Sequence, residues 1–162
     1  MSAILLPYTH ACFVCGASNP HGLQLKFRAE HGEIRADFHP QPHHAGYKGM
    51  IHGGIIATAL DEAMFWAAAY IRKRFYVSVE LNVRYLKKVE VGRSYLLVAR
   101  FVGEKKKVCV TEGELRNAEG ELCATAGGRY FPMRDEDVPL GLEDFCADPN
   151  TLSPMEFFQR SG

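Results

Sequence analysis

The chain has 162 residues, of which 47% are hydrophobic and 23% charged, and its 19 basic and 19 acidic residues give a formal net charge of zero. These values are typical of a soluble globular protein that can bury a sizeable core, and the length predicts one domain. The balanced charge excludes the strongly basic surface of most nucleic-acid-binding proteins, so no nucleic-acid partner is expected.

The N-terminal segment, residues 1–22, begins with a short apolar run that lacks a preceding basic residue and is too short for a signal peptide. Five cysteines without the spacing of a disulfide framework predict a reducing, cytoplasmic location. Cys12 and Cys15 form a single CxxC pair, with only His10 and His21 close by in the sequence. A structural zinc site needs four ligands, so we expect these cysteines to pack the loop and no metal to bind.

The middle of the chain shows the period of two that is typical of strands. Two alternating runs, 23–29 and 34–38, flank His31-Gly32 and predict a β-hairpin. Four further strands are expected over residues 75–85, 95–102, 107–115 and 121–131. In the first of these, the odd-numbered residues from Phe75 to Tyr85 are expected on the buried face, and Ser78 with the other even-numbered residues on the opposite face. We predict that these four form an antiparallel meander. Residues 132–162, rich in proline and acidic residues, are expected to cover the domain as an irregular tail.

Residues 54–71 form the most apolar segment, with Thr58, Asp61 and Glu62 as its only polar side chains. A helix that is apolar on nearly all sides must be buried, and only the predicted sheet is large enough to bury it. The adjacent acids argue against a membrane span. The sequence therefore predicts an α+β domain in which an antiparallel sheet of about five to six strands wraps around one long central helix.

The two acids near the middle of this helix raise a question about their surroundings. Asp61 lies two turns inside, too deep to cap the helix start, and its neighbours one turn away are small or apolar apart from Thr58. A carboxylate there is costly to bury unless it is hydrogen-bonded or paired. Two interpretations stay open: Asp61 lies on a solvated face, or it is held inside for catalysis. Glu62, turned by about 100°, is expected to reach solvent or a salt bridge.

His52, Gly53 and Gly54 open the predicted helix. The first N–H groups of a helix lack intrahelical partners and lie at the positive end of its dipole. Such a terminus can bind an anion or a carbonyl oxygen that gains negative charge, and glycine allows a ligand or a second chain to approach closely. The alternative is that the glycines only make a tight entry into the helix.

The segment HGGIIATALDEAM resembles the HGG-x7-D signature of hotdog-fold acyl-CoA thioesterases of the phenylacetyl-CoA type. Two flanking segments, CFVCGASNPHGLQLKF and SVELNVRYLKKVEVG, resemble the N-terminal segment and the strand after the helix in that family. The resemblance covers most of residues 12–92. It implies a hotdog domain, a homodimer or a dimer of dimers with its active site at the interface, an acyl-CoA substrate, and no further cofactor.

The same resemblance implies roles for individual residues. Asp61 would act as the general base on water, or as a nucleophile that forms a mixed anhydride, and the Gly53 N–H would bind the thioester oxygen. Ser78 of the partner chain would help to position the water, and His52 would hold the loop and the helix start in place. The residues expected to contact the substrate are Gly54, Gly46, Tyr47, Arg84, Lys87 and Lys88.

Some features leave alternatives open. Many family members carry an asparagine where this chain has Gly46, so the site either works without that contact or is a weaker catalyst, with Tyr47 or His44 as substitutes. The basic residues over 84–93 fit either CoA phosphates or ordinary exposed side chains, whereas those at 105–107 are expected only to protect an edge.

Two other functions remain as rivals: an acyl-CoA-binding hotdog protein without turnover, and a hotdog hydratase or dehydratase. Met64, Phe65 and Trp66 either line an acyl pocket or belong to the core.

Overall fold

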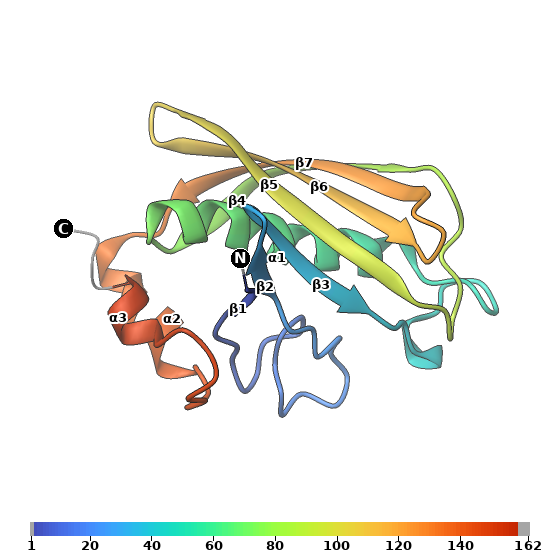
Figure 1. Ribbon diagram of the computed structural model, residues 1–162, viewed down its shortest axis with the longest axis horizontal. Coiled ribbons are helices and arrows are strands. Elements are labelled where there is room, and N and C mark those ends of the chain that lie inside the picture. The colour runs from blue at the N-terminus through green and yellow to red at the C-terminus, as the bar shows by residue number, and fades with distance from the viewer. Residues whose placement is uncertain (1, 159–162) are drawn as a thin grey trace.

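The computed structural model describes residues 2–158 and shows a seven-stranded antiparallel sheet curved around one long helix, α1 (Gly53–Arg72) (Figure 1). This arrangement confirms the predicted α+β architecture, with one or two strands more than expected. The strands are β1 (Ile4–Leu5), β2 (Arg28–Glu30), β3 (Glu33–Phe38), β4 (Tyr76–Tyr85), β5 (Tyr95–Lys105), β6 (Val108–Asn117) and β7 (Leu122–Pro132).

The order of strands in the sheet is β1-β2-β3-β5-β6-β7-β4, so β4 pairs with β7 and lies at an edge. The predicted four-strand meander is therefore wrong for β4, although β5, β6 and β7 follow one another. The cause is the connection over residues 86–94. Ile51 N–H donates to the Val89 carbonyl (2.8 Å) and Val91 N–H to the Gly49 carbonyl (3.0 Å). These bonds carry the chain across the loop before α1 instead of through a tight turn, which places residues 86–89 beside the helix start.

The predicted hairpin is confirmed, but its first strand is shorter than expected. His31 and Gly32 form the turn with positive φ angles of 53° and 78°, and β2 begins only at Arg28. Residues 23–27 instead bind the N-terminal loop: Leu23 N–H donates to Phe13 O (2.8 Å) and Leu25 N–H to Val14 O (2.9 Å). The loop over residues 10–22, which consists of turns and bends, is thereby attached to the segment that precedes β2.

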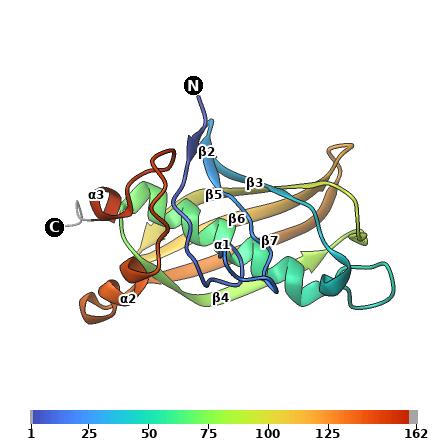
Figure 2. The same cartoon turned by 90° about the horizontal axis from the view of Figure 1, so that it is seen from below.

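Helix α1 lies on the concave face of the sheet, and Figure 2 shows the N-terminal loop crossing beneath it. Its buried side chains are Ile56, Ala59, Leu60, Ala63, Met64, Trp66, Ala67, Ala68 and Ala69. The helix is long and apolar enough to cross a membrane, but half of its most apolar window is already buried inside the molecule. Core helices share these properties, so length and composition alone do not place α1 in a membrane.

The tail after β7 is more ordered than predicted. It contains a short 3₁₀ helix (Asp135–Asp137), α2 (Val138–Glu143) and α3 (Pro154–Phe158), while residues 159–162 lie outside the described part of the chain. Phe158 is 7% exposed and stacks on Phe75, with ring centroids 3.8 Å apart. The tail therefore packs aromatic side chains at one end of α1, and Figure 2 shows α2 and α3 beside that end.

Candidate active site

A β-bulge in β4 decides which side chains face the helix. The register of β4 against β7 shifts between Ser78 and Glu80, which leaves Val79 as the extra residue. Before the bulge Tyr76 is buried and Val77 is 44% exposed, the reverse of the predicted alternation. Bulges commonly re-aim a side chain next to a functional site. Here the bulge turns Ser78, predicted to face away from the core, toward α1.

The side chain of Asp61 is held from two strands. Tyr130 Oη donates to Asp61 Oδ1 (2.8 Å) and also to the Asp61 carbonyl oxygen (2.9 Å), while Ser78 Oγ donates to Oδ2 (3.2 Å). Ser78 and Tyr130 are direct cross-strand partners, so their side chains leave the same face of the sheet. Asp61 is half-buried and both its oxygens have a donor, which offsets the cost of placing a carboxylate in an apolar helix.

Two features of this arrangement differ from the expectations. Ser78 reaches Asp61 within one chain, rather than from a partner chain as the resemblance implied. Thr58, the hydroxyl expected beside Asp61, instead donates to the Gly54 carbonyl (2.8 Å). Thr58 therefore forms no hydrogen bond with the Asp61 carboxylate, whose two donors both come from the sheet.

Tyr130 is a residue that the sequence reasoning missed. It is only 1% exposed, and burial together with the neighbouring Asp61 carboxylate raises its pKa, so it stays a hydrogen-bond donor. The available signal was its phase in β7, which it shares with the buried Ala124 and Ala126. A buried tyrosine needs a partner for its hydroxyl, and an apolar helix with a single deep acid offers one.

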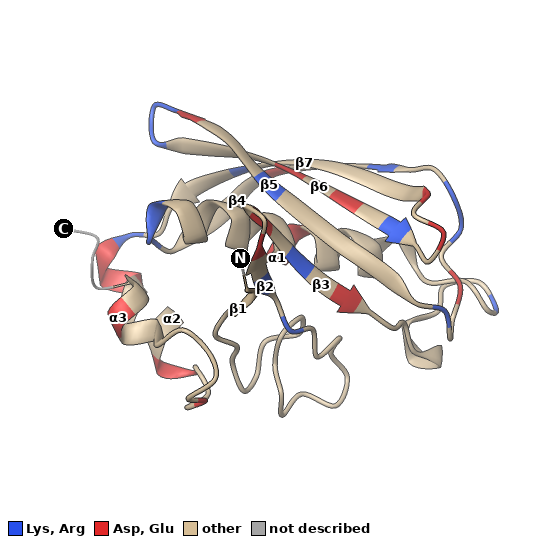
Figure 3. Ribbon diagram, viewed as in Figure 1, with Lys and Arg blue, Asp and Glu red and all other residues tan. Residues whose placement is uncertain are grey.

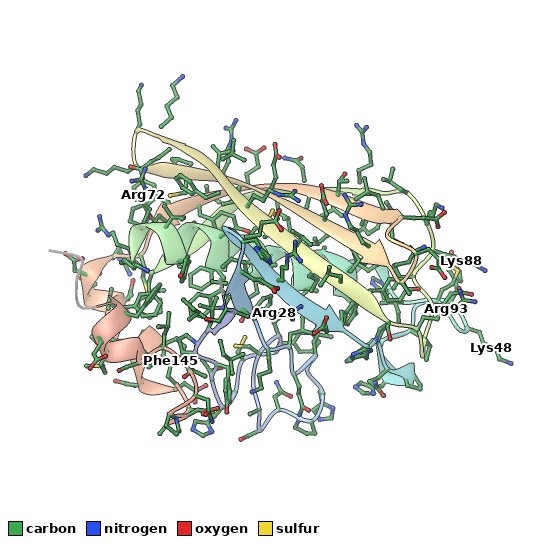
Figure 4. The ribbon with its side chains drawn as sticks, in the orientation of Figure 1. Arg28, Lys48, Arg72, Lys88, Arg93 and Phe145 are labelled. Carbon is green, nitrogen blue, oxygen red and sulfur yellow. The ribbon has the colours of Figure 1, made fainter. Side chains whose placement is uncertain are left out.

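Asp61 and Ser78 line a cavity of about 520 Å³ between α1, the start of β4, the N-terminal loop and the tail. Its apolar wall includes Phe65 and Trp66, whereas Met64 is fully buried core. Phe145 of the tail, labelled in Figure 4, closes another side. The cavity thus offers a carboxylate at an apolar surface large enough to receive part of a small organic group.

Glu62 is half-buried and forms no salt bridge among residues 2–158, so only the solvent part of its prediction is met, and that only partly. Its side chain points into the same cavity, toward the N-terminal loop, where the thiol of Cys12 donates to Oε2 (3.1 Å). Burial, followed by the charge of Cys12, raises the pKa of Glu62 to about 8. The helix thus carries two adjacent acids in different settings: Asp61 is held by hydroxyls, and Glu62 lies against a pair of cysteines, since Cys15 is also part of this wall.

The start of α1 is built around His52. This residue is the N-cap, and its Nδ1 accepts the Gly54 N–H at 2.9 Å, so Gly54 has no donor left for a substrate. A Cβ on Gly46 would lie 3.2 Å from the Cα of His52, which explains the glycine there by close packing. The predicted role of His52 in holding the loop and the helix start agrees with this geometry.

The Gly53 N–H is the open donor of this terminus: it has no acceptor among residues 2–158. Tyr85 Oη donates to the Gly53 carbonyl at 2.7 Å, and a Cβ on Gly53 would lie 3.2 Å from the Tyr85 ring. A larger residue here would crowd the Tyr85 ring, so glycine suits this close approach. The two interpretations of the glycine pair, a tight entry into the helix and an open donor, are compatible with each other.

A second cavity of about 640 Å³ adjoins the helix start and is lined in part by Gly46, Tyr47, Gly53, Lys87 and Lys88. Tyr47 is 82% exposed at its rim. Lys87 and Lys88 already pair with Glu121 (2.7 Å) and Glu90 (3.4 Å), but such exposed pairs are weak and can exchange partners.

Arg84 lines neither of the two cavities, so the structure does not bring this predicted contact residue into the site. The basic residues at the tip of the β5–β6 hairpin lie at the opposite end of the molecule from the helix start (Figure 3).

The two halves of the predicted site do not meet within one chain. Asp61 lies eight residues beyond Gly53 on the same helix, about 12 Å along its axis. The cavity at the helix start and the cavity at Asp61 have no lining residue in common. A single acyl carbon cannot contact both the Asp61 carboxylate and the Gly53 N–H of one chain.

Comparison with known protein families gives one match: residues 48–124 fit the model of the thioesterase superfamily. This segment contains α1, β4, β5, β6 and the beginning of β7. An uncharacterized protein of Schizosaccharomyces pombe is 34% identical over 111 residues, which are 65% of this chain and 61% of that protein. The chain thus spans less than two thirds of this relative.

Acyl-coenzyme A thioesterase 13 of Homo sapiens is 26% identical over 95 residues, covering 57% of this chain and 68% of the human protein. Among solved structures, the thioesterase superfamily protein RHA08564 superposes with a TM-score of 0.70 at 21% identity, covering 76% of this chain and 60% of that chain. At this identity the likeness concerns the fold alone. The seven-stranded sheet and its central helix are the hotdog fold expected from the sequence.

Proposed function

We propose that this protein is an acyl-CoA thioesterase, which hydrolyses a thioester to a free acid and coenzyme A in a site shared by two chains. One observation carries the proposal: the carboxylate of Asp61, two turns inside an apolar helix, faces a cavity with both oxygens held by hydroxyl donors. The match of residues 48–124 to the thioesterase superfamily and the similarity to an acyl-CoA thioesterase support this chemistry.

The need for a second chain follows from the edge of the sheet. β4 is a ten-residue edge strand, and its Val77 and Val79 are 44% and 58% exposed. A long apolar edge strand is prone to pair with another chain, and two copies can do so through a twofold axis. The other edge strand, β1, has only two residues and offers no comparable surface.

Antiparallel pairing of β4 with its symmetry mate would join the separated halves of the site. The end of β4 is tied to the helix start, because Tyr85 binds Gly53, and its beginning is tied to the helix middle, because Ser78 binds Asp61. In an antiparallel pair the end of one strand lies opposite the beginning of the other. Gly53 of the partner subunit would therefore lie near Asp61, and each dimer would hold two equivalent sites.

The chemistry in such a site needs a base, a donor for the oxyanion and an orienting group. Each Asp61 oxygen retains a lone pair beyond the one used by Tyr130 or Ser78, so the carboxylate can accept a proton from water. The water oxygen attacks the thioester carbon, and the carbonyl oxygen gains a negative charge that the N–H of Gly53 of the partner subunit stabilises. As the carbon–sulfur bond breaks, the proton passes from Asp61 to the departing sulfur, giving a free acid and a thiol.

The acyl group and the coenzyme A phosphates would occupy different parts of the surface in this proposal. The acyl group would lie against the apolar wall with Phe65 and Trp66. The phosphates of coenzyme A would lie near Lys87, Lys88 and Arg93, which gather around a smaller recess of about 330 Å³. Figure 4 shows Lys88 and Arg93 at one end of the molecule, the end at which α1 starts. This arrangement would leave the charged phosphates of coenzyme A in solvent and bury the apolar acyl group.

The proposal is tested by incubating the purified protein with acyl-CoAs of increasing chain length and with phenylacetyl-CoA. Loss of the thioester absorbance is the better readout, because the five cysteines of the chain would react with a thiol reagent. We expect turnover of at least one substrate and its loss in Asp61→Asn. Binding without turnover of any substrate would favour a non-catalytic acyl-CoA-binding protein. Hydration of an enoyl-CoA with an intact thioester would favour the hydratase.

A further inference from the structure

The N-terminal loop and the middle of α1 bring three metal-binding side chains together. The ligand atoms of Cys12, Cys15 and Glu62 all lie within 4.8 Å of one another, and Cys12 Sγ is 3.1 Å from Glu62 Oε2. Fifty residues separate the helix acid from the cysteines in the sequence, so the cluster exists only in the folded chain. This third ligand is the one that the sequence alone did not reveal.

The backbone of the loop is wound so that both sulfur atoms face the helix. Gly16 N–H donates to the Cys12 carbonyl at 2.8 Å, and a Cβ on Gly16 would lie only 2.2 Å from that oxygen, so the turn after the CxxC pair requires glycine. Val14 N–H donates to Cys12 Sγ at 3.3 Å. A backbone donor to sulfur favours a thiolate, which is the form that binds metals.

In the deprotonated form that binds metals, the cluster would need a cation. Two thiolates and a carboxylate in one half-buried place repel each other and lose hydration. Among residues 2–158, Glu62 forms no ion pair with a lysine, arginine or histidine. The histidine nearest in sequence, His10, directs its ring to Ser18 at 3.5 Å. A divalent ion would supply the missing positive charge.

The donor set and its spacing indicate which ion fits. Thiolate ligands select zinc over magnesium or calcium, and zinc sites with three protein ligands keep a fourth position for water. Zinc–ligand bonds of about 2.0–2.3 Å in a tetrahedron place ligand atoms about 3.5–3.8 Å apart. The ligand atoms of the cluster, all within 4.8 Å of one another, lie near this spacing.

We propose that Cys12, Cys15 and Glu62 bind one zinc ion, which fastens the N-terminal loop to α1 beside Asp61. All three proposed ligands also line the cavity that contains Asp61 and Ser78. The site holds the loop that forms one wall of this cavity. The proposal stands on the cluster itself and does not depend on thioesterase activity.

The test begins with wild-type protein purified with a phosphine reductant and without chelators. Metal analysis is expected to find one zinc ion per chain. After its removal, titration with Co²⁺ should give sulfur-to-cobalt absorption that saturates at one equivalent and disappears when Zn²⁺ is added. These readouts use the intact chain and need no activity measurement. A wild-type protein that binds neither ion would overturn the proposal and leave the cluster as a proton-sharing group.

Variants then assign the ligands. Cys12→Ser, Cys15→Ser and the isosteric Glu62→Gln are each expected to lose stoichiometric zinc and to bleach the cobalt absorption. Cys146→Ser is the matched control, because Cys146 is another half-buried cysteine outside the cluster, and it should keep one ion per chain. Loss of metal in the control, or full retention in all three ligand variants, contradicts the assignment.

Two further measurements separate loss of zinc binding from loss of folding and from loss of the proposed activity. Circular dichroism and thermal unfolding report whether a cysteine variant folds, and where it does not, the cobalt titration of the wild type and Glu62→Gln decide. Asp61→Asn should bind zinc as the wild type does even if it loses all hydrolysis. Zinc binding without turnover would therefore overturn the proposed function alone.

Discussion

The two ends of the proposed site are built in opposite ways. In the middle of α1, Asp61 is surrounded by partners: both carboxylate oxygens accept hydrogen bonds, and Tyr130, one of the donors, is almost fully buried. At the start of α1, the N–H of Gly53 has no acceptor among residues 2–158, and Tyr47 at the rim is 82% exposed. One region is complete in a single chain, and the other is open.

This difference matches two separate demands of acyl transfer. A general base must be oriented before the reaction, which the hydroxyls on β4 and β7 achieve. An oxyanion donor must stay unpaired until the substrate oxygen gains its charge. Under the proposed function, each chain would carry its base at one end of β4 and an unpaired donor at the other, and pairing of two edge strands would bring the two regions together.

The largest effect on activity is expected when Asp61, in the middle of α1, loses its charge. Asp61→Asn preserves the shape of the side chain and can still accept from Tyr130, while its amide N–H would donate to Ser78, but it cannot accept a proton from water. We expect kcat to fall by about 10²–10⁴-fold, the usual share of a general base. Thermal unfolding should show a fold at least as stable as the wild type, because a costly carboxylate has been replaced by a neutral amide. An unchanged kcat would remove Asp61 from the reaction.

Mixing two defective chains tests most directly whether Asp61 of one chain works with Gly53 of the other. Gly53→Pro removes the open N–H at a helix position that tolerates proline, and Gly53→Ala controls for crowding against Tyr85 because it keeps the N–H. Homodimers of Asp61→Asn and of Gly53→Pro should both be inactive. A doubly tagged mixed dimer should recover about half of wild-type activity, since one of two symmetric sites is then intact. No recovery would mean that both residues serve the same chain's site.

A smaller effect is expected when Asp61 keeps its charge but loses its main support. Tyr130→Phe removes the donor to Oδ1, and we expect kcat to fall about tenfold with little change in KM, because only the orientation of the base is lost. Tyr95→Phe is the matched control: Tyr95 is also buried and accepts the Glu90 N–H, but it lies away from Asp61. Equal kinetic losses in both variants would assign Tyr130 a structural role only.

The features that could be predicted from the sequence are those set by local spacing. The helix, its glycine entry and the deep position of Asp61 follow from residues one or two turns apart, and the alternating runs locate most strands. The pairing of β4 with β7, the partners of Asp61 and the burial of Glu62 depend on contacts between distant segments. A single extra residue, Val79, reverses the face of Ser78, and no pattern in the sequence marks that bulge.

The smallest effect is expected from Ser78, and it separates the two donors of Asp61. The Ser78 bond to Oδ2 is 3.2 Å long, against 2.8 Å for the bond from Tyr130, so Ser78→Ala should lower kcat only about twofold to fivefold. Thr58→Ala is its control: this hydroxyl lies one turn from Asp61 on the same helix but donates to the Gly54 carbonyl.

A mixed dimer of Ser78→Ala with Asp61→Asn tests whether Ser78 acts within its own chain or across the interface. In this dimer only one site has a wild-type Asp61, and that Asp61 belongs to the Ser78→Ala chain. If Ser78 acts within its own chain, this site lacks the serine hydroxyl, and its activity falls by the same small factor as in the Ser78→Ala homodimer. If instead Ser78 acts across the interface, the recovered site contains wild-type Ser78 from the Asp61→Asn chain, and the small loss disappears.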